Sequence, residues 1–495
     1  MSVATVAITH EKLKIPTVSL HYNEMMSIAG DAASTPDNAM PSLRRISFDA
    51  TVRVSSQAQA LAQTVIDELT RPLDEEETYA GKWAFAPEQH YLAEGAYEEV
   101  RYAMEGDLNR CTLTLAAAQF TDGTPVALPT ETALEKMLKG TSKSRDVVVG
   151  RIQPNNNLAT VEYVAIAGIM AGLKPETMPL LLALTECMSN THDFGSSLGG
   201  ADGYFAFGTV VNGPAVEDMK INTGGPSNAG PAPLSPGVPT NTGIGRFMRL
   251  IQINIGGTEP GIFEAKGLGN PFKTSIVIGE ANGETDWPGM SSVISKNPMA
   301  GDNSKFGTRE STVSLFVLWG DMLLVINDQY SGDAPADDVE TPPSGYTQEQ
   351  WSACRTNLSR LVERAKNLNC PQQGLVAMIR PVMARNLARA GVTREMAMRW
   401  ISDYCNETNQ KARIRGLGSG IFGAGFTVQG ENLHAEWNSA SWLPPAAGEG
   451  AQPEAIVKFF PNPKLINIIV GPGLTYSGLV MNGLPRWTAS IDAWR

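Results

Sequence analysis

Three side chains of this sequence have the type and setting for acid–base chemistry. Glu162 falls near the start of an apolar helical segment, residues 159–171, directly after a polar loop. A partly buried carboxyl there would have a raised pKa and could exchange a proton, whereas an exposed one would only stabilise the helix dipole. His192, beside an aspartate in a glycine-rich stretch, and Asp122, in a Thr-Asp-Gly turn, are the other candidates. We expect Glu162 to be the main acid–base residue.

Asparagines that stand close to glycines form the densest polar group of the chain. Their amides donate and accept hydrogen bonds, and the glycines let a ligand approach the backbone. The same asparagines could instead cap turns and helices. An arginine and a lysine in the group suit a carboxylate or a similarly anionic substrate. The residues expected to bind substrate are Asn212, Asn222, Gly224, Asn241, Arg246, Lys273 and Glu280.

Motifs for metals and cofactors are weak in this sequence. Its five histidines form no H-x-x-x-H pair, and its five cysteines form no C-x-x-C pair, so we predict no metal site. Residues 418–423 satisfy G-x-G-x-x-G, but a basic segment precedes them rather than a buried strand, and we interpret them as a glycine-rich turn. The cofactor is therefore unknown at this point.

Composition limits the partners that we expect for this protein and the compartment in which we expect it. The 495 residues carry a formal net charge of −12, which argues against a nucleic-acid partner because phosphate binding needs a basic face. We see no apolar run of about 18 residues and no signal-peptide pattern, so we expect no membrane association. An odd, dispersed set of cysteines is typical of reduced thiols, and we predict a cytoplasmic protein.

The elements that must position these residues follow a mixed α/β pattern. We predict a truncated N-terminal α/β unit, residues 1–77, followed by a larger mixed α/β (α+β) body formed by residues 78–330 and 331–495. Apolar periodicity and terminal signals give the individual elements. A helix is expected to begin after Thr130, with Glu131 and Glu135 in its first turns. Further helices are expected at 5–14, 58–70, 159–171, 176–188, 243–253, 348–368 and 394–406, and strands at 15–20, 45–48, 110–115, 146–152, 205–211, 275–278 and 465–470.

Several motifs, in the same order along the chain, resemble the UGSC-type (seleno)protein family. They include 120–130 (FTDGTPVALPT), 159–162 (ATVE), 211–214 (VNGP), 221–225 (INTGG) and 243–246 (GIGR), and the likeness spans residues 112–300. Residues 6–20 are similar to the part that follows the Sec/Cys-Gly-Ser-Cys motif of that family, and the motif itself is absent. The resemblance implies an α/β architecture in which either another subunit supplies the redox-active loop or thiol chemistry has been abandoned.

These observations favour a subunit of an enzyme that converts a small molecule. In the first hypothesis it cleaves or reduces a metabolite, as a lyase or an oxidoreductase, and forms a hetero-oligomer with a Cys/Sec-containing chain that supplies the thiol or selenol. In the second it is a cysteine-independent lyase or hydratase that uses Glu162, Asp122 or His192. In the third it is a non-catalytic subunit that only binds a ligand.

Overall fold

A computed structural model describes most of the main body and a small part of the N-terminal region. Near the N-terminus, strands β1 (Ser19–Tyr22) and β2 (Arg45–Phe48) pair in parallel, and helix α3 (Ser55–Thr70) follows. The strand expected at 45–48 and the helix expected at 58–70 are confirmed, while the helix expected at 5–14 lies outside the described residues. The structure describes residues 19–22, 45–48, 55–72, 108–118, 120–153, 157–191, 205–223, 240–258, 276–281, 285–293, 296, 304–326, 342–368, 374–414, 427–428, 431–432, 444–445, 448, 450–471 and 478–495.

The strand predicted at 110–115 is wrong, because this segment lies within helix α6 (Leu108–Ala117). Cys111 and Leu115 are 1% and 2% exposed, whereas Leu113 is 62% exposed. Side chains at positions i and i+4 lie on the same face of a helix, and the side chain at i+2 lies on the opposite face. A strand would have placed all three side chains on one face.

Helices and a hairpin precede the central sheet. Helix α7 begins after Thr130, whose side chain accepts a hydrogen bond from the Ala133 N–H. Helix α8 begins in the same way after Thr160, which accepts from the Tyr163 N–H. These elements are α7 (Glu131–Leu138), β3 (Val148–Ile152), β4 (Asn157–Thr160), α8 (Val161–Met170), η4 (Pro175–Thr177) and α9 (Met178–Ser189).

A six-stranded mixed sheet forms the centre of the body. Its strand order is β13-β8-β14-β7-β5-β6, in which the outer pairs run parallel and every other neighbour runs antiparallel. The strands are β5 (Phe205–Asn212), β6 (Val277–Gly279), β7 (Thr312–Ile326), β8 (Leu375–Ile379), β13 (Ile466–Val470) and β14 (Gly478–Ser490). The mixed α/β fold class is thereby confirmed.

The sheet curls until its two outer strands meet at their C-terminal ends. The Ala281 N–H, just after β6, donates to the Val470 carbonyl at the end of β13 (2.8 Å). The concave side is filled by one apolar cluster with members from all six strands, among them Ala206, Ile278, Phe316, Met378, Ile469 and Met481.

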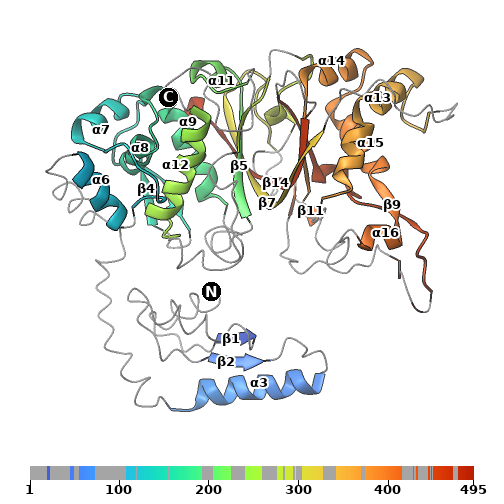
Figure 1. Cartoon of the computed structure of the whole chain (residues 1–495), viewed down its shortest axis with the longest axis horizontal. Coiled ribbons are helices and arrows are strands. Elements are labelled where there is room, and N and C mark those ends of the chain that lie inside the picture. Colours follow the sequence, from blue (N-terminus) through green and yellow to red (C-terminus); the bar gives the residue numbers. More distant parts are fainter. Residues whose placement is uncertain are drawn as a thin grey trace.

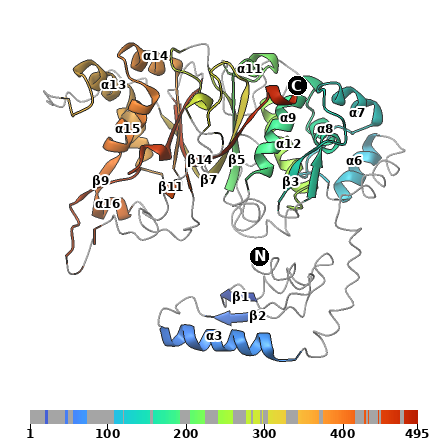
Figure 2. The same cartoon turned by 180° about the vertical axis from the view of Figure 1, so that it is seen from behind.

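The sheet consists of two units with the same topology. In each unit the first strand is followed by two helices, then by an outer strand parallel to it, and then by a long central strand, and in the second unit further short elements within 406–465 come before the outer strand. Figures 1 and 2 show the helices of the two units on opposite flanks of the sheet. The first unit comprises β5, α11 (Ala215–Asp218), α12 (Thr240–Asn254), β6 and β7; the second comprises β8, α14 (Pro381–Arg389), α15 (Arg394–Tyr404), β13 and β14.

Hydrogen bonds at matching positions support this equivalence. The Glu280 N–H donates to the Val211 carbonyl (2.9 Å) at the end of β5, and the Gly471 N–H donates to the Ile379 carbonyl (3.0 Å) at the end of β8. A helix also precedes each unit, α9 in the first and α13 (Gln348–Ala365) in the second, and each packs over the convex side of the central strands. The chain therefore repeats one β-α-α-β-β arrangement, although its sequence shows no fixed period.

Separate apolar cores lie between each unit and its helices. The first unit packs against α8, α9 and α12, and the second packs against α13, α14 and α15. No helix in the described part of the chain is both long and apolar enough to cross a membrane. The remaining elements are η7 (Met290–Ser292), β9 (Asn406–Thr408), α16 (Asn409–Ile414), β10 (Thr427–Val428), β11 (Glu431–Asn432), β12 (Ile456–Lys458), η9 (Pro463–Leu465) and η10 (Asp492–Trp494).

Candidate functional site

Glu162 lies in the first turn of α8, as the sequence predicts, and its carboxylate is held by an arginine. Arg145 donates to it through Nε (2.9 Å) and Nη2 (2.6 Å). The Glu162 N–H also donates to the Arg145 carbonyl (2.9 Å). The arginine side chain is 44% exposed and the glutamate 18%, so this bidentate pair lies near the surface.

Asp122 and Arg246, predicted for different roles, form an ion pair with each other. Arg246 donates to both carboxylate oxygens (2.9 and 2.8 Å) and to the Thr124 carbonyl (3.0 Å). The Thr124 hydroxyl donates to the same carboxylate (2.7 Å). Burial acts to raise the pKa of Asp122, but the hydrogen bonds from Arg246 and Thr124 and the charge of Arg246 outweigh it, so the pKa lies below its ordinary value. This pair joins the 121–124 turn to α12.

Asn222 and Asn241 are hydrogen-bonded to each other, and Asn222 contributes its backbone N–H rather than its side chain. The Asn222 N–H donates to Asn241 Oδ1 (2.8 Å), and Asn241 Nδ2 donates to the Val277 carbonyl of β6 (2.9 Å). Both asparagines are buried, at 2% exposure each. Asn241 thus ties the start of α12 to the outer strand of its unit.

Glu280 and Asn212 belong to a buried cluster where β6 and β13 meet. Glu280 Oε1 accepts from Arg394 Nη1 (3.0 Å) and from the Val470 N–H (3.0 Å). Its Oε2 accepts from Asn212 Nδ2 and from the Met290 N–H (2.7 Å). The glutamate and arginine side chains are only 1% and 2% exposed. Donors from both units therefore converge on one carboxylate, and we call this set the Glu280 clasp.

Arg394 completes the clasp from the start of α15. It donates to the Ile468 carbonyl of β13 and, through Nη2, to the Pro288 carbonyl (2.8 Å). Its guanidinium also lies over the Trp287 ring, 5.3 Å from the centroid, where a cation is attracted by the ring face. Since Ile468 pairs with β8 as Val277 pairs with β5, Arg394 occupies the place in the second unit that Asn241 occupies in the first.

The described candidates thus form separate clusters rather than one constellation. No hydrogen bond or ion pair within the described residues joins Glu162 to Asp122 or either of them to Glu280. The other predicted site residues, His192, Gly224 and Lys273, lie outside the described residues.

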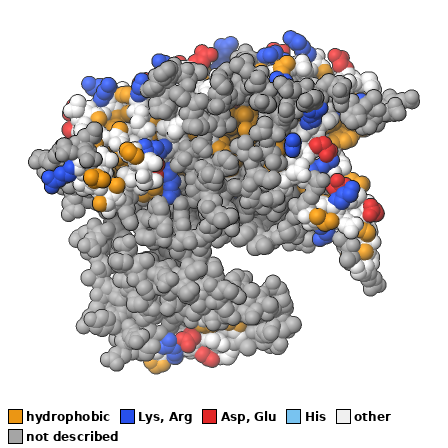
Figure 3. Space-filling view, viewed as in Figure 1, with side chains coloured by type: hydrophobic (Ala, Val, Ile, Leu, Met, Phe, Trp, Pro, Cys, Tyr) orange, Lys and Arg blue, Asp and Glu red, His pale blue; other side chains and the backbone are white. Residues whose placement is uncertain are grey.

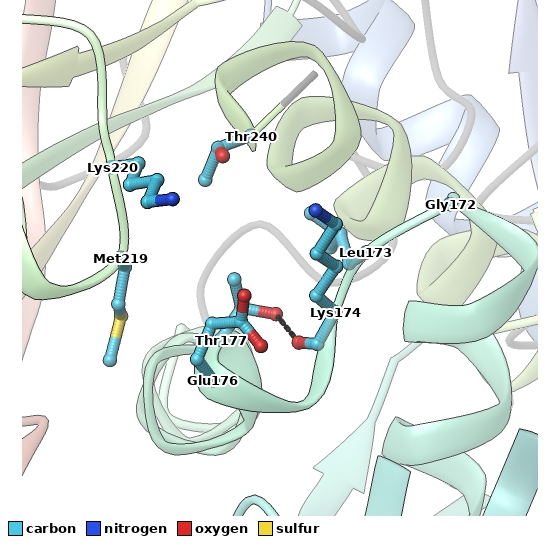
Figure 4. A pocket seen from close by; sticks show the side chains of 8 residues that line it. All are labelled: Gly172, Leu173, Lys174, Glu176, Thr177, Met219, Lys220 and Thr240. Carbon is cyan, nitrogen blue, oxygen red and sulfur yellow. Dashed lines mark hydrogen bonds between the residues drawn. The ribbon is translucent and has the colours of Figure 1, made fainter. Parts of the chain in front are cut away.

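A shallow, solvent-open pocket, whose enclosed part has room for about one water molecule, lies between the α8–α9 turn, the end of α11 and the start of α12. Figure 4 shows Lys174 and Lys220 bordering this space from opposite sides, with the Glu176 carboxylate beside it. We call this space the lysine pocket. Its lining residues are Gly172, Leu173, Lys174, Glu176, Thr177, Met219, Lys220 and Thr240.

Sequence reasoning missed both lysines. Lys174 stands in the stop between two predicted helices, and Lys220 stands two residues before a predicted ligand, Asn222. Lys220 has a φ of 55°, and it is the non-glycine residue of positive φ among those described. A left-handed lysine leaves no signature in sequence, because that conformation normally selects glycine. On the face of the molecule seen in Figure 3, described Lys and Arg side chains are interspersed with Asp and Glu side chains. No basic patch on this face therefore marks an anion-binding site.

The described cysteines do not form a reactive site. Cys111, Cys187, Cys354 and Cys405 are buried, and they form no disulfide bond with one another. Burial raises the pKa of Cys354 to about 12 and, together with the nearby charge of Glu186, raises the pKa of Cys187 well above its ordinary value. These two thiols therefore stay protonated, and the thiolate is the nucleophilic form.

No group of three or more metal-ligating side chains occurs within the described part of the chain. No family model, no curated protein and no solved structure matches this sequence.

Proposed function

We propose that this chain is the anion-binding subunit of an enzyme that cleaves or reduces a small metabolite in the cytoplasm. A partner chain in a hetero-oligomer supplies the reacting thiol or selenol. The lysine pocket carries the proposal, because two ammonium groups border one shallow, solvent-open space, where they attract an anionic group of a small molecule. The resemblance of residues 112–300 to UGSC-type proteins favours the same class of function.

The states of the candidate catalytic groups support a reacting group from elsewhere. Glu162 and Asp122 are each engaged by an arginine through two hydrogen bonds, and a general base must have a free lone pair in reach of its substrate. The described thiols are buried. The lack of disulfide bonds among the four described cysteines also fits a reducing compartment.

The test is to isolate the tagged chain from its native cells and to identify the chains that co-purify in stoichiometric amount. The assembly is then incubated with a cell metabolite extract, and the loss of individual carboxylates and phosphate esters is followed by mass spectrometry. We expect a partner with a Cys/Sec-Gly-Ser-Cys loop and turnover that iodoacetamide abolishes.

The other outcomes of this experiment contradict the proposal in distinct ways. Turnover that survives iodoacetamide would favour the cysteine-independent lyase or hydratase. A chain that purifies alone and binds a metabolite without converting it would be a ligand-binding protein.

A further inference from the structure

The two units of the sheet differ at one turn, and this difference singles out Lys220. After α11, the Ile221 N–H donates to the Val216 carbonyl (2.9 Å), and after α14 the Val392 N–H donates to the Leu387 carbonyl (2.9 Å). Both helices thus end in the same six-residue turn, which needs a left-handed residue one position before the donor.

The left-handed residue is Gly391 in the second unit, with φ 75°, and Lys220 in the first, with φ 55°. Glycine adopts this conformation without steric cost, whereas a side chain with a Cβ does not. The first unit therefore carries a lysine at the position where glycine is the stable choice. Residues held in such conformations cluster at functional sites.

The space beside this turn is also open in one unit and filled in the other. In the second unit, Gln350 from the first turn of α13 donates to the Gly391 carbonyl (3.0 Å) and occupies the groove between helix and turn. In the first unit, the segment before α9 leaves the lysine pocket open between Lys174 and Lys220. Among the described residues, a side chain thus lies against the turn of the second unit, whereas the turn of the first unit borders the lysine pocket.

Charges around the pocket leave Lys220 available to an anion. Neither Lys174 nor Lys220 forms an ion pair with another described residue, and Asp218, two positions before Lys220, is paired with Arg495 (2.8 Å). Among the described lining residues, Glu176 is the acidic side chain. Two ammonium groups against one carboxylate give the pocket a net positive charge, which favours a ligand with an oxyanion group.

We propose that Lys220 is the residue that selects an oxyanion, a carboxylate or a phosphate, on the small molecule that docks at the lysine pocket. This deepens the proposed function and rests on it for the identity of the ligand as a substrate. Binding of the anion itself does not depend on the partner chain.

The test is isothermal titration of the full chain with inorganic phosphate and, separately, with succinate, together with thermal unfolding in the absence of anion. In Lys220→Gly we expect affinity for the preferred anion to fall about tenfold or more, the scale of one charge-assisted hydrogen bond. The same variant should unfold at an equal or higher temperature, because glycine relieves the strained φ. Lys220→Arg keeps the charge and should bind within a few-fold of the parent.

Lys136→Gln on α7 is the matched control, since it removes an exposed lysine that is not among the lining residues of the pocket. Unchanged affinity in Lys220→Gly, or an equal loss in Lys136→Gln, would overturn the inference, the latter because it marks non-specific attraction. Stronger binding of phosphate than of succinate, or the reverse, identifies the anion. If anion binding depends on Lys220 but no assembly shows turnover, the proposed function fails and this inference stands.

Discussion

Replacing Glu280 by glutamine tests whether the Glu280 clasp holds the curled sheet closed. Glutamine keeps the shape of the side chain but has one carbonyl oxygen in place of two carboxylate oxygens. Each oxygen of Glu280 accepts from two donors, Arg394 and Val470 on one side and Asn212 and Met290 on the other. Whichever orientation the amide takes, its NH₂ group faces two donors and satisfies neither.

The size of the effect follows from burial. An unsatisfied buried donor costs about 1–3 kcal/mol, so two of them cost about 2–6 kcal/mol. Removing one partner of a buried ion pair costs about 3–5 kcal/mol by itself, and the two ranges describe overlapping losses. We therefore expect Glu280→Gln to lower the free energy of unfolding by about 3–5 kcal/mol, a large part of the 5–15 kcal/mol typical of a folded protein.

Urea unfolding followed by far-UV circular dichroism measures this difference. Glu162→Gln is the matched control, since it makes the same change in an ion pair that lies near the surface, where the cost is about 0–1 kcal/mol. Equal costs for the two variants, or a cost below about 1 kcal/mol for Glu280→Gln, would refute the structural role of the clasp. If Glu280→Gln does not fold, Asn212→Ala removes a single donor and should give a smaller loss in the same direction.

Two further predictions concern the other candidate residues. Because the folded-state pKa of Asp122 lies below its ordinary value, its ion pair stabilises the fold above that ordinary value and ceases to do so as the pH falls through the folded-state pKa. Asp122→Asn should therefore lower the free energy of unfolding by about 1–3 kcal/mol at pH 7, and the difference from the parent should shrink towards zero in acid; a difference independent of pH would contradict the pairing. For Glu162→Gln we expect near-normal turnover in the active assembly, since Arg145 holds the carboxylate, and a loss of about 10²-fold in kcat with intact folding would instead show that Glu162 is catalytic.

Local patterns in the sequence predict much of the secondary structure. Thr130 and the glutamate after it mark the start of α7, and Gly172 with the proline at 175 marks the stop between α8 and α9, because caps and breakers act within a few residues. The prediction of a strand at 110–115 was wrong. Threonines that alternate with apolar residues favour a strand, whereas the burial of Cys111 and Leu115 against the core selects a helix. Tertiary packing decides in such cases.

For the candidate site, too, the sequence shows which residues are polar but not which partners they have. The sequence alone identified Asp122, Arg246, Asn241 and Glu280 as notable polar residues, since type and neighbours are visible in it. Their partners depend on contacts between distant segments, such as the Glu280 carboxylate and the Val470 N–H, which are 190 positions apart. Only the tertiary structure showed that these residues tie strands and helices together.

What the sequence by itself determined is the mixed α/β class, the acidic character and most of the helices, because each depends on composition or on periodicity within one segment. The repeated unit, the closure of the sheet and the lysine pocket were decided by the tertiary structure. The left-handed conformation of Lys220 is imposed by the turn after α11, and its counterpart Gly391 lies 171 positions further along the chain. A local pattern cannot encode that correspondence, because it exists only once two distant turns adopt the same hydrogen bonds.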